Sequence, residues 1–150
     1  MKILFVCTGN TCRSPLAQAI LQEKIQEESL EIEVDSAGIG CGIGEPMSDN
    51  TSAIIKEMDI SFTHTSQPVT AKLVDSCDII VTMTRFHKAY LEGLVDKKKL
   101  FCIDDITNTG DISDPYGLDM QTYKAVETQL REAMPAIVEK LKEVANTDGN

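Results

Sequence analysis

The sequence predicts an α/β fold, with one parallel sheet built from strands that alternate with helices. Short apolar runs such as residues 3–6 and 77–82 are typical of buried parallel strands, and segments with apolar residues at helical spacing separate them. No repeat, low-complexity tract or interdomain linker interrupts the 150 residues. Because parallel strands are joined by right-handed crossovers, this alternation favours a single sheet, and we expect residues 1–150 to form one domain.

The N-terminal half is predicted to contain a strand, a helix, a second strand, a loop and a second helix. These elements cover, in that order, residues 3–6, 15–28, 30–34, 38–44 and 49–58. Leu16 and Ile20 begin the apolar stripe of the first helix, and alternation of apolar residues with Glu marks the second strand as half-exposed. Repeated glycines indicate the loop, and Ser48 or Asp49 is the N-cap of the second helix.

The C-terminal half is predicted to contain a short helix, a central strand, a helix, a short strand and a long helix. The short helix begins at Thr70 or Ala71, and the others cover residues 77–82, 86–94, 100–103 and 120–144. Apolar residues recur every three or four positions in the last helix, which is the spacing of a core-facing helix. Pro135 lies inside this helix and is expected to kink or split it. Residues 146–150 are expected to be a frayed tail.

Composition argues against several classes of protein. A formal net charge of −10 argues against nucleic acid partners, which require a basic surface. No stretch approaches the roughly 18 consecutive apolar residues of a membrane span, and the N-terminus lacks the cleavage pattern of a signal peptide. Five cysteines without a framework spacing indicate a reducing compartment. We therefore expect a cytoplasmic protein.

The segment from Cys7 to Arg13 places a thiol, a run of backbone N–H groups and a cation between the first strand and a helix that Pro15 opens. Backbone donors and the positive end of a helix dipole make such a junction an anion site, and the same field favours the thiolate form of a cysteine. Arg13 can hold two phosphate oxygens with its planar guanidinium. A nucleophile inside a phosphate-binding loop indicates phosphoryl transfer through a cysteinyl-phosphate.

Other residues of the loop can support this chemistry. Ser14 can donate a hydrogen bond to the Cys7 thiolate, or it can simply cap the helix, and the sequence leaves both possibilities open. Gly9 and Asn10 tolerate positive φ, which a loop that turns its N–H groups inward requires.

The leaving group also needs a proton, which a carboxylic acid can supply. Asp114 is our candidate, and Pro115, which follows it, holds the backbone of Asp114 extended. On the residues alone, Asp104, Asp105 and Asp111 compete with it. In the second half-reaction the same carboxylate would activate the hydrolytic water.

The segment VCTGNTCRSP (residues 6–15) resembles the phosphate-binding loop of the low-molecular-weight protein-tyrosine phosphatase family, and Asp114-Pro115-Tyr116 resembles that family's general-acid loop. The resemblance implies a three-layer α/β domain with a central four-stranded parallel sheet flanked by helices. It also implies hydrolysis of phosphorylated proteins without metal or cofactor, with inorganic phosphate and vanadate as inhibitors. The catalytic residues would be Cys7, Arg13 and Asp114. Phosphate or substrate would be bound by Thr8, Gly9, Asn10, Thr11, Cys12, Ser14 and Tyr116.

Two departures from the tyrosine phosphatases of this family bear on the substrate. Thr11 stands where they usually carry an aliphatic residue, and residues 39–50 contain no aromatic residue that could face Tyr116 across a phenyl ring. The loop with Thr8 and Thr11 instead resembles the bacterial protein-arginine-phosphatase branch. We therefore expect phosphoarginine as the substrate, with Thr11 orienting the hydrolytic water and Asp114 pairing with the guanidinium; phosphotyrosine is the alternative.

Cys12 allows two interpretations. It is either a buried, space-filling thiol or a resolving cysteine that traps oxidised Cys7 as a disulfide, and we expect the second. A Cys–His protease would need His64 or His87 as its base, but the phosphate-binding loop already stabilises the thiolate. We expect both histidines to be structural polar groups.

Further alternatives have less support in the sequence. Cys41, Cys77 and Cys102 lack the paired spacing of metal ligands. An arsenate reductase of this fold would need a downstream cysteine pair that residues 82–88 do not offer, and sugar-phosphotransferase carrier domains lack the arginine at this spacing. A non-catalytic phosphoprotein-binding module is the remaining alternative.

Overall fold

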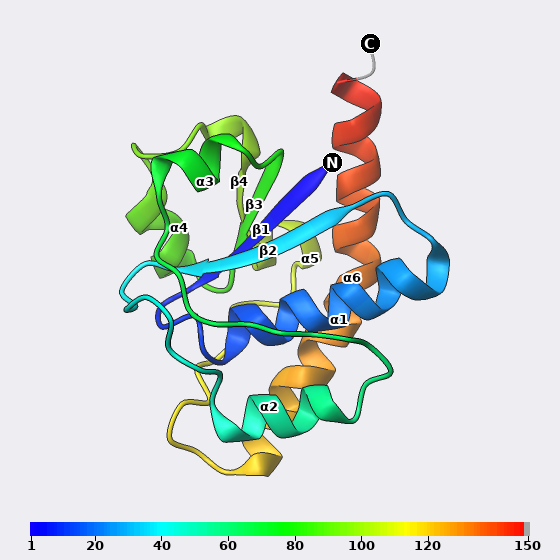
Figure 1. Cartoon of the computed structure of the whole chain (residues 1–150). Coiled ribbons are helices and arrows are strands. Elements are labelled where there is room, and N and C mark those ends of the chain that lie inside the picture. Colours follow the sequence, from blue (N-terminus) through cyan, green and yellow to red (C-terminus); the bar gives the residue numbers. More distant parts are fainter. Residues whose placement is uncertain (149–150) are drawn as a thin grey trace.

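The computed structural model describes residues 1–148 (Figure 1). The strands are β1 (Lys2–Cys7), β2 (Glu33–Gly38), β3 (Ile79–Thr82) and β4 (Leu100–Cys102). The α-helices are α1 (Arg13–Glu28), α2 (Asp49–Lys56), α3 (Ala71–Asp75), α4 (Arg85–Leu91), α5 (Ile103–Thr107) and α6 (Met120–Asp148). A single 3-10 turn, η1 (Lys97–Lys99), precedes β4.

The strands form one parallel sheet in the order β2-β1-β3-β4, which confirms the predicted α/β fold. β1 lies inside the sheet, where Phe5 pairs with Ser36 on one side and Val81 on the other. The chain first moves outward from β1 to β2 and then returns past β1 to β3. Ligands of open α/β sheets bind beyond the carboxyl ends of the strands at such a reversal, so the loop after β1 lies where a ligand is expected.

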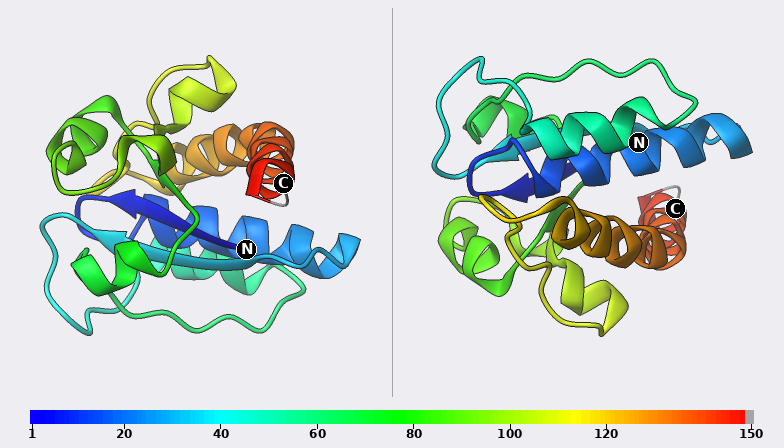
Figure 2. Two further views of the ribbon diagram at one scale, coloured as in Figure 1. Left: turned by 90° about the horizontal axis from the view of Figure 1, so that it is seen from above. Right: turned by 90° about the horizontal axis from the view of Figure 1, so that it is seen from below.

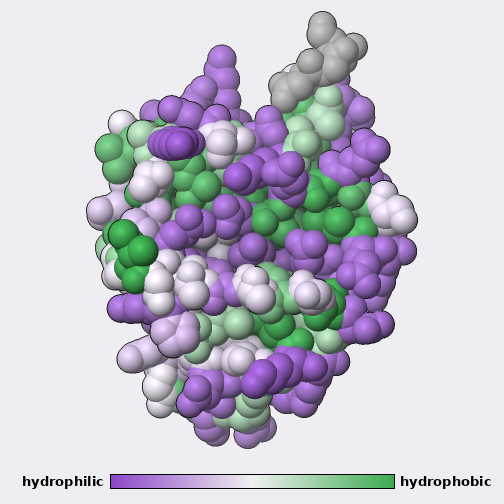
Figure 3. Space-filling model, in the orientation of Figure 1, coloured by the Kyte–Doolittle hydropathy of each residue, from purple (hydrophilic) through white to green (hydrophobic). Residues whose placement is uncertain are grey.

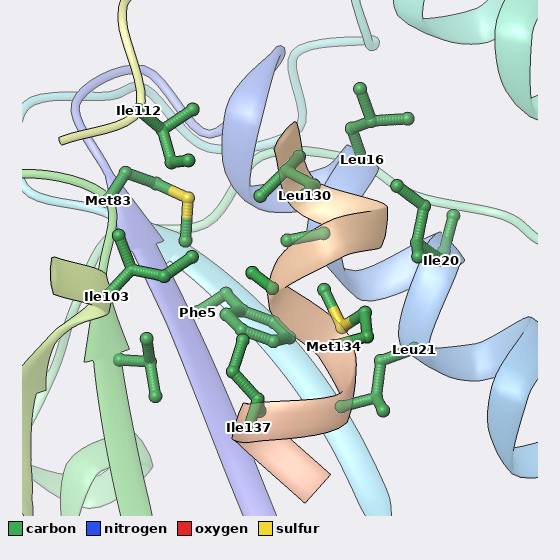
Figure 4. Packing of buried hydrophobic residues seen from close by; sticks show 14 of the residues in the cluster. Phe5, Leu16, Ile20, Leu21, Met83, Ile103, Ile112, Leu130, Met134 and Ile137 are labelled. Atoms are coloured by element: carbon green, nitrogen blue, oxygen red, sulfur yellow. The ribbon is translucent and has the colours of Figure 1, made fainter. Parts of the chain in front are cut away.

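Helices cover both faces of the sheet and make the three predicted layers (Figures 1 and 2). Alternate residues of β1 point to opposite faces. Ile3 and Phe5 belong to the larger core with α1 and α6, whereas Leu4 and Val6 belong to the smaller core under α3 and α4. Figure 4 shows Phe5 among side chains from α1 and α6. This packing holds β1, and the loop that follows it, in the middle of the molecule.

The second strand lies later in the chain than residues 30–34, where the sequence predicts it. β2 spans Glu33–Gly38 because it pairs with the whole of β1, and its last residue lies beside Cys7. Ser36 interrupts the apolar pattern of this strand, yet it is buried and its hydroxyl donates to Gln18. Because the end of β2 is part of a polar network at the site, the hydrophobic pattern does not predict it as a strand.

Four further elements are shorter than predicted. α2 ends at Lys56 instead of residue 58, and β3 begins at Ile79 instead of residue 77. α4 ends at Leu91 because Gly93, with φ of 90°, turns the chain away from the helix. β4 ends at Cys102 because α5 begins directly after it. The sequence does not predict α5 or η1, since each is too short to show a helical period of apolar residues.

Pro135 does not split the last helix, which is continuous over Met120–Asp148, although the orange and red parts of α6 run in different directions, as a kink would produce (Figures 1 and 2). Pro135 itself is exposed, while Ile137 is fully buried on the opposite side. Packing of the buried side outweighs the one backbone hydrogen bond that a proline removes. The helix also includes residues 146–148 of the predicted frayed tail, and residues 149–150 lie outside the described part of the chain.

Hydrophilic side chains cover much of the face shown in Figure 3, with smaller hydrophobic areas between them. None of the helices described within residues 1–148 is both long enough and apolar enough to span a membrane.

Candidate active site

The predicted phosphate-binding loop joins the carboxyl end of β1 to the N-terminus of α1. Four of its carbonyl groups turn outward and accept hydrogen bonds from surrounding segments. These bonds run from Ile39 N to Cys7 O (3.0 Å), Gly40 N to Thr8 O (3.0 Å), His64 Nε2 to Asn10 O (2.8 Å) and Ser48 N to Thr11 O (3.0 Å). Because the carbonyl groups are held outside, the loop can turn its N–H groups toward an anion at its centre.

Asn10 organises the loop from within. It is fully buried with φ of 55°, which confirms the positive φ predicted there, whereas Gly9 does not adopt positive φ. One left-handed residue is enough for this turn, because its side chain holds it in place. Asn10 Oδ1 accepts from Gln67 N (2.9 Å), and this contact fixes the orientation of the amide. Nδ2 therefore donates to Ser14 Oγ (2.8 Å) and Ser36 Oγ (3.0 Å).

Ser14 faces the candidate nucleophile. Its Oγ lies 2.9 Å from Cys7 Sγ, and both residues are buried. Since Ser14 Oγ already accepts from Asn10, its own proton is available to the sulfur, so Ser14 is the donor of this pair. The N-cap of α1 is Cys12. Of the two roles that the sequence leaves open for Ser14, the structure therefore favours stabilisation of the Cys7 thiolate.

Arg13 and Asp114, distant in the sequence, meet at the loop. Arg13 is the first residue of α1 and only 5% exposed. Its Nη1 donates to Ile112 O (3.0 Å), and its Nη2 lies 3.6 Å from Asp114 Oδ2. The carbonyl of Ile112 thus fixes the guanidinium, while the Asp114 side chain, 54% exposed, remains accessible from solvent.

The competing carboxylates lie elsewhere. Asp104 and Asp105 pair with Arg85 at 2.7 and 3.1 Å, and the hydrogen bond from Arg85 lowers the pKa of Asp104. Asp111 accepts a hydrogen bond from the backbone N of Arg85 (3.1 Å). Of these four candidates, Asp114 alone lines the cleft over the loop, as far as the described residues show.

The cleft has a volume of about 320 Å³, at the lower end of what small-molecule sites occupy. The phosphate-binding loop lines it with Cys7, Thr8, Gly9, Thr11, Cys12 and Arg13. Its remaining walls consist of Gly40, Cys41, Gly42, Glu45, Asp114 and Tyr116. Among the described residues that line the cleft, Tyr116 alone is aromatic. Asn10 and Ser14, which the sequence places among the binding residues, are not part of this lining, and their side chains form hydrogen bonds that support the loop.

The sequence analysis missed four residues of this cleft, Gly40, Cys41, Gly42 and Glu45, of which Cys41 and Glu45 carry ionisable side chains. Glu45 adds a second carboxylate to the cleft that Asp114 lines, and Cys41 adds a third thiol. Burial raises the pKa of the Cys41 thiol, and the neighbouring charges of Cys7 and Glu45 act in the same direction. Both residues lie in a glycine-rich loop without a periodic pattern, so their placement at the site has no signal in a single sequence.

Cys12 contacts a residue of the last helix. Its Sγ lies 3.3 Å from the hydroxyl oxygen of Tyr123, and both residues are buried. Burial and the contact with Cys12 raise the pKa of Tyr123 to about 12. Cys12 and Cys7 line the same cleft, which brings both predicted redox residues to one place.

The two histidines form structural hydrogen bonds, as the sequence predicts. His64 donates to the carbonyl of Asn10, and burial lowers the pKa of its ring. His87 forms a capping box with Thr84 at the start of α4. The hydrogen-bond partner of Cys7 is Ser14, so the arrangement does not support a Cys–His protease. Within residues 1–148, no group of three or more His, Cys, Asp or Glu side chains could hold a metal ion.

Residues 2–147 match the family model described as low molecular weight phosphotyrosine protein phosphatase. The chain belongs to this family. Its fold is that of this family, and the chain is a phosphatase.

Relatives of two kinds are similar to it. A protein-arginine-phosphatase of Bacillus subtilis (strain 168) is 33% identical over 146 residues, which are 95% of this chain and 97% of the relative. PtpB of Staphylococcus aureus, named a low molecular weight protein-tyrosine-phosphatase, is 35% identical over 148 residues, covering 96% and 99% of the two chains.

Solved structures of phosphatases superpose closely on this chain. A crystal structure of a YwlE mutant from Bacillus subtilis has a TM-score of 0.87 at 32% identity, covering 95% of this chain and 99% of that one. A second structure is that of the YwlE arginine phosphatase as a cysteine-to-serine mutant with a phosphorylated active-site serine. It has a TM-score of 0.87 at 32% identity, covering 95% of this chain and 96% of that one.

Proposed function

We propose that this phosphatase hydrolyses phosphoarginine in proteins through a cysteinyl-phosphate intermediate. The observation that carries the proposal is the composition of the cleft. Above the phosphate-binding loop stand the carboxylates of Glu45 and Asp114, with small residues at 40–42. Carboxylates attract a guanidinium and can form hydrogen bonds with its N–H groups, whereas a phenyl ring gains most from flat apolar walls on both sides.

The first half-reaction transfers the phosphoryl group to Cys7. The thiolate attacks phosphorus in line with the leaving nitrogen, so that an S–P bond forms as the P–N bond breaks. Inward N–H groups of the loop and the guanidinium of Arg13 stabilise the charge on the equatorial oxygens. Asp114, in its protonated form, gives its proton to the departing nitrogen, and arginine is released.

The second half-reaction returns the enzyme to its starting state. Asp114, now a carboxylate, takes a proton from water as the water attacks phosphorus. The hydroxyl of Thr11, which lines the cleft, orients this water. Cys7 leaves as a thiolate that accepts the hydrogen bond from Ser14, and inorganic phosphate departs. Every group that the reaction needs is supplied by the chain, without metal or cofactor.

The named relatives support this proposal. The proteins from Bacillus subtilis and Geobacillus stearothermophilus that bear the name protein-arginine-phosphatase are 33% and 34% identical to this chain. In the YwlE mutant, a serine in place of the cysteine carries a phosphoryl group. A covalent intermediate on Cys7 is the equivalent species here.

Phosphotyrosine is the second candidate substrate. Tyr116 at the cleft could contact one side of a phenyl ring, and PtpB of Staphylococcus aureus is 35% identical to this chain. The opposing argument is the absence of any aromatic residue from residues 39–50.

Three further properties belong to the proposal. Phosphorylated proteins of the cytoplasm would be its substrates, and inorganic phosphate and vanadate would inhibit it by occupying the loop. Oxidation of Cys7 would lead to a disulfide with Cys12, because both thiols line one cleft. Reduction of that disulfide would restore activity.

The Thr11→Ile variant tests the choice of substrate. Isoleucine keeps the β-branch, and hence the backbone preference, but replaces the hydroxyl with apolar bulk. We expect the parent to prefer phosphoarginine peptides over phosphotyrosine peptides of the same sequence. The variant should lose most phosphoarginine turnover and keep or improve phosphotyrosine turnover, measured as the ratio of kcat/KM values. A parent that prefers phosphotyrosine would favour the tyrosine phosphatase, and an equal ratio in both proteins would show that Thr11 does not determine the choice of substrate.

A further inference from the structure

A buried histidine on α4 contacts the phosphate-binding loop from outside the cleft. His87 is 2% exposed, and its Nε2 lies 2.8 Å from Oγ1 of Thr8, the residue after the nucleophile. On the other side of the ring, Nδ1 lies 3.2 Å from the backbone N of Thr84 and 2.9 Å from its Oγ1. The ring therefore bridges the N-cap of α4 and the start of the loop.

The partners of this ring determine where its proton is. A backbone N–H can only donate, so Nδ1 accepts from Thr84 and carries no proton. Burial, followed by the positive charge of Arg13, lowers the pKa of His87 to about 4. The ring is thus neutral near pH 7, with its single proton on Nε2. His87 therefore donates a hydrogen bond to Thr8 Oγ1.

This donation leaves the hydroxyl proton of Thr8 available for another acceptor. Thr8 lines the cleft, and its Cγ2 is directed toward Gly40, 3.7 Å from the position that a Cβ would take there. With the methyl group on that side and Oγ1 at His87, the rotamer of Thr8 is defined. A phosphoryl oxygen bound in the cleft can accept a hydrogen bond from this hydroxyl.

The segment that carries His87 is itself anchored to the acid loop. The backbone N of Arg85 donates to Asp111 Oδ1 (3.1 Å), and the N of Ile112 donates to the carbonyl of Met83 (2.9 Å). The carbonyl of Ile112 in turn holds Arg13. The start of α4 thus braces both parts of the site, which gives His87 a fixed position from which to hold the loop.

We propose that His87 is a positioning residue of this phosphatase, and that its Nε2–H holds Thr8 so that the hydroxyl of Thr8 donates to the bound phosphoryl group. The same contact is made with free phosphate, with substrate and with the transition state. Its loss therefore weakens binding more than it slows the chemical step. The inference does not depend on whether the leaving group is arginine or tyrosine.

Two variants separate this contact from the helix cap. His87→Asn keeps an oxygen that can accept from Thr84 N but is too short to reach Thr8, and Thr8→Val removes only the hydroxyl. We expect each to raise the inhibition constant of inorganic phosphate, and the KM of an aryl phosphate, about tenfold while kcat stays near the parent value. Because the two substitutions remove the same interaction, the double variant should bind phosphate as tightly as Thr8→Val alone.

Two further variants complete the test. His87→Gln can place an amide N–H near the position of Nε2, so it should recover much of the phosphate affinity that His87→Asn loses. Thr84→Ala weakens the cap without touching Thr8, so it should lower the melting temperature yet keep the parent inhibition constant. Parent-like phosphate affinity in His87→Asn, additive losses in the double variant, or an equal loss in Thr84→Ala would each overturn the proposal.

Discussion

Asp114 differs from its acidic neighbours in what its side chain faces. It lies 3.6 Å from Arg13 and lines the cleft, whereas Asp104 and Asp105 are engaged with Arg85 at the surface. Asp114→Asn removes the proton donor and keeps the shape. We expect turnover of a substrate with a poor leaving group to fall by about 10²–10⁴-fold, and that of an activated aryl phosphate much less. Equal losses on both substrates would exclude Asp114 as the acid.

Cys12 has a partner in Tyr123 and shares the cleft with Cys7, so its role can be tested through oxidation. Mild peroxide should inactivate the parent reversibly, with a Cys7–Cys12 disulfide visible in peptide mapping. Cys12→Ser should instead lose activity irreversibly, because Cys7 proceeds to higher oxidation states. If thiol treatment restores the variant as fully as the parent, Cys12 is only a space-filling thiol.

At the scale of single residues, the sequence predicts what lies within one motif. The spacing of Cys7 and Arg13 indicated the loop, and Asn10 has the positive φ expected of it. Selecting Asp114 among four carboxylates needed the family resemblance, since spacing alone does not show which one faces the cleft. Glu45 could not be found at all, because it reaches the cleft through a loop whose path depends on tertiary contacts.

At the scale of elements, the end of β2 packs against the phosphate-binding loop so closely that only glycine fits. A Cβ on Gly38 would lie 2.5 Å from the carbonyl oxygen of Thr8 and 2.9 Å from Cys41 Sγ. Gly38→Ala should therefore push the loop outward. We expect it to lower the free energy of unfolding by about 1–3 kcal/mol in urea titration, and to reduce turnover as well.

Gly40→Ala is the matched control for stability. A Cβ at Gly40 would meet Thr8 Cγ2 at an ordinary 3.7 Å. Its unfolding free energy should stay close to that of the parent. If Gly38→Ala is equally harmless, the packing of β2 against the loop does not set the position of Thr8.

The predictability of each element depends on how local its signal is. Helix caps involve neighbouring residues. Ser48, one of the two predicted caps, accepts from Thr51 N, and Thr70 accepts from Leu73 N and caps a helix that begins at Ala71, one of its two predicted starts. The prediction of β2 is wrong because its final residues are held by pairing with β1 and by the hydrogen-bond network at Ser36, and not by hydrophobic burial. Such long-range contacts produce no periodic pattern of apolar residues in the sequence.

At the scale of the whole molecule, the topology explains why the site is where it is. The sheet reverses its strand order at β1, so the loop after this strand is open to a ligand while both flanking layers hold it in place. The formal net charge of −10 is a property of the whole chain, whereas Arg13 and the loop N–H groups determine the field at the phosphate. The sequence predicts this division between an acidic protein and an anion-binding loop.

Trapping of the intermediate tests the central claim most directly. Parent protein is mixed with a phosphoarginine peptide, quenched during turnover and digested, and the peptide that contains Cys7 is analysed by mass spectrometry, with Cys7→Ala as the control. The account predicts a phosphoryl group on Cys7 in the parent and no hydrolysis by the variant. Hydrolysis of phosphoarginine without phosphorylated Cys7, or activity of Cys7→Ala within about tenfold of the parent, would contradict it.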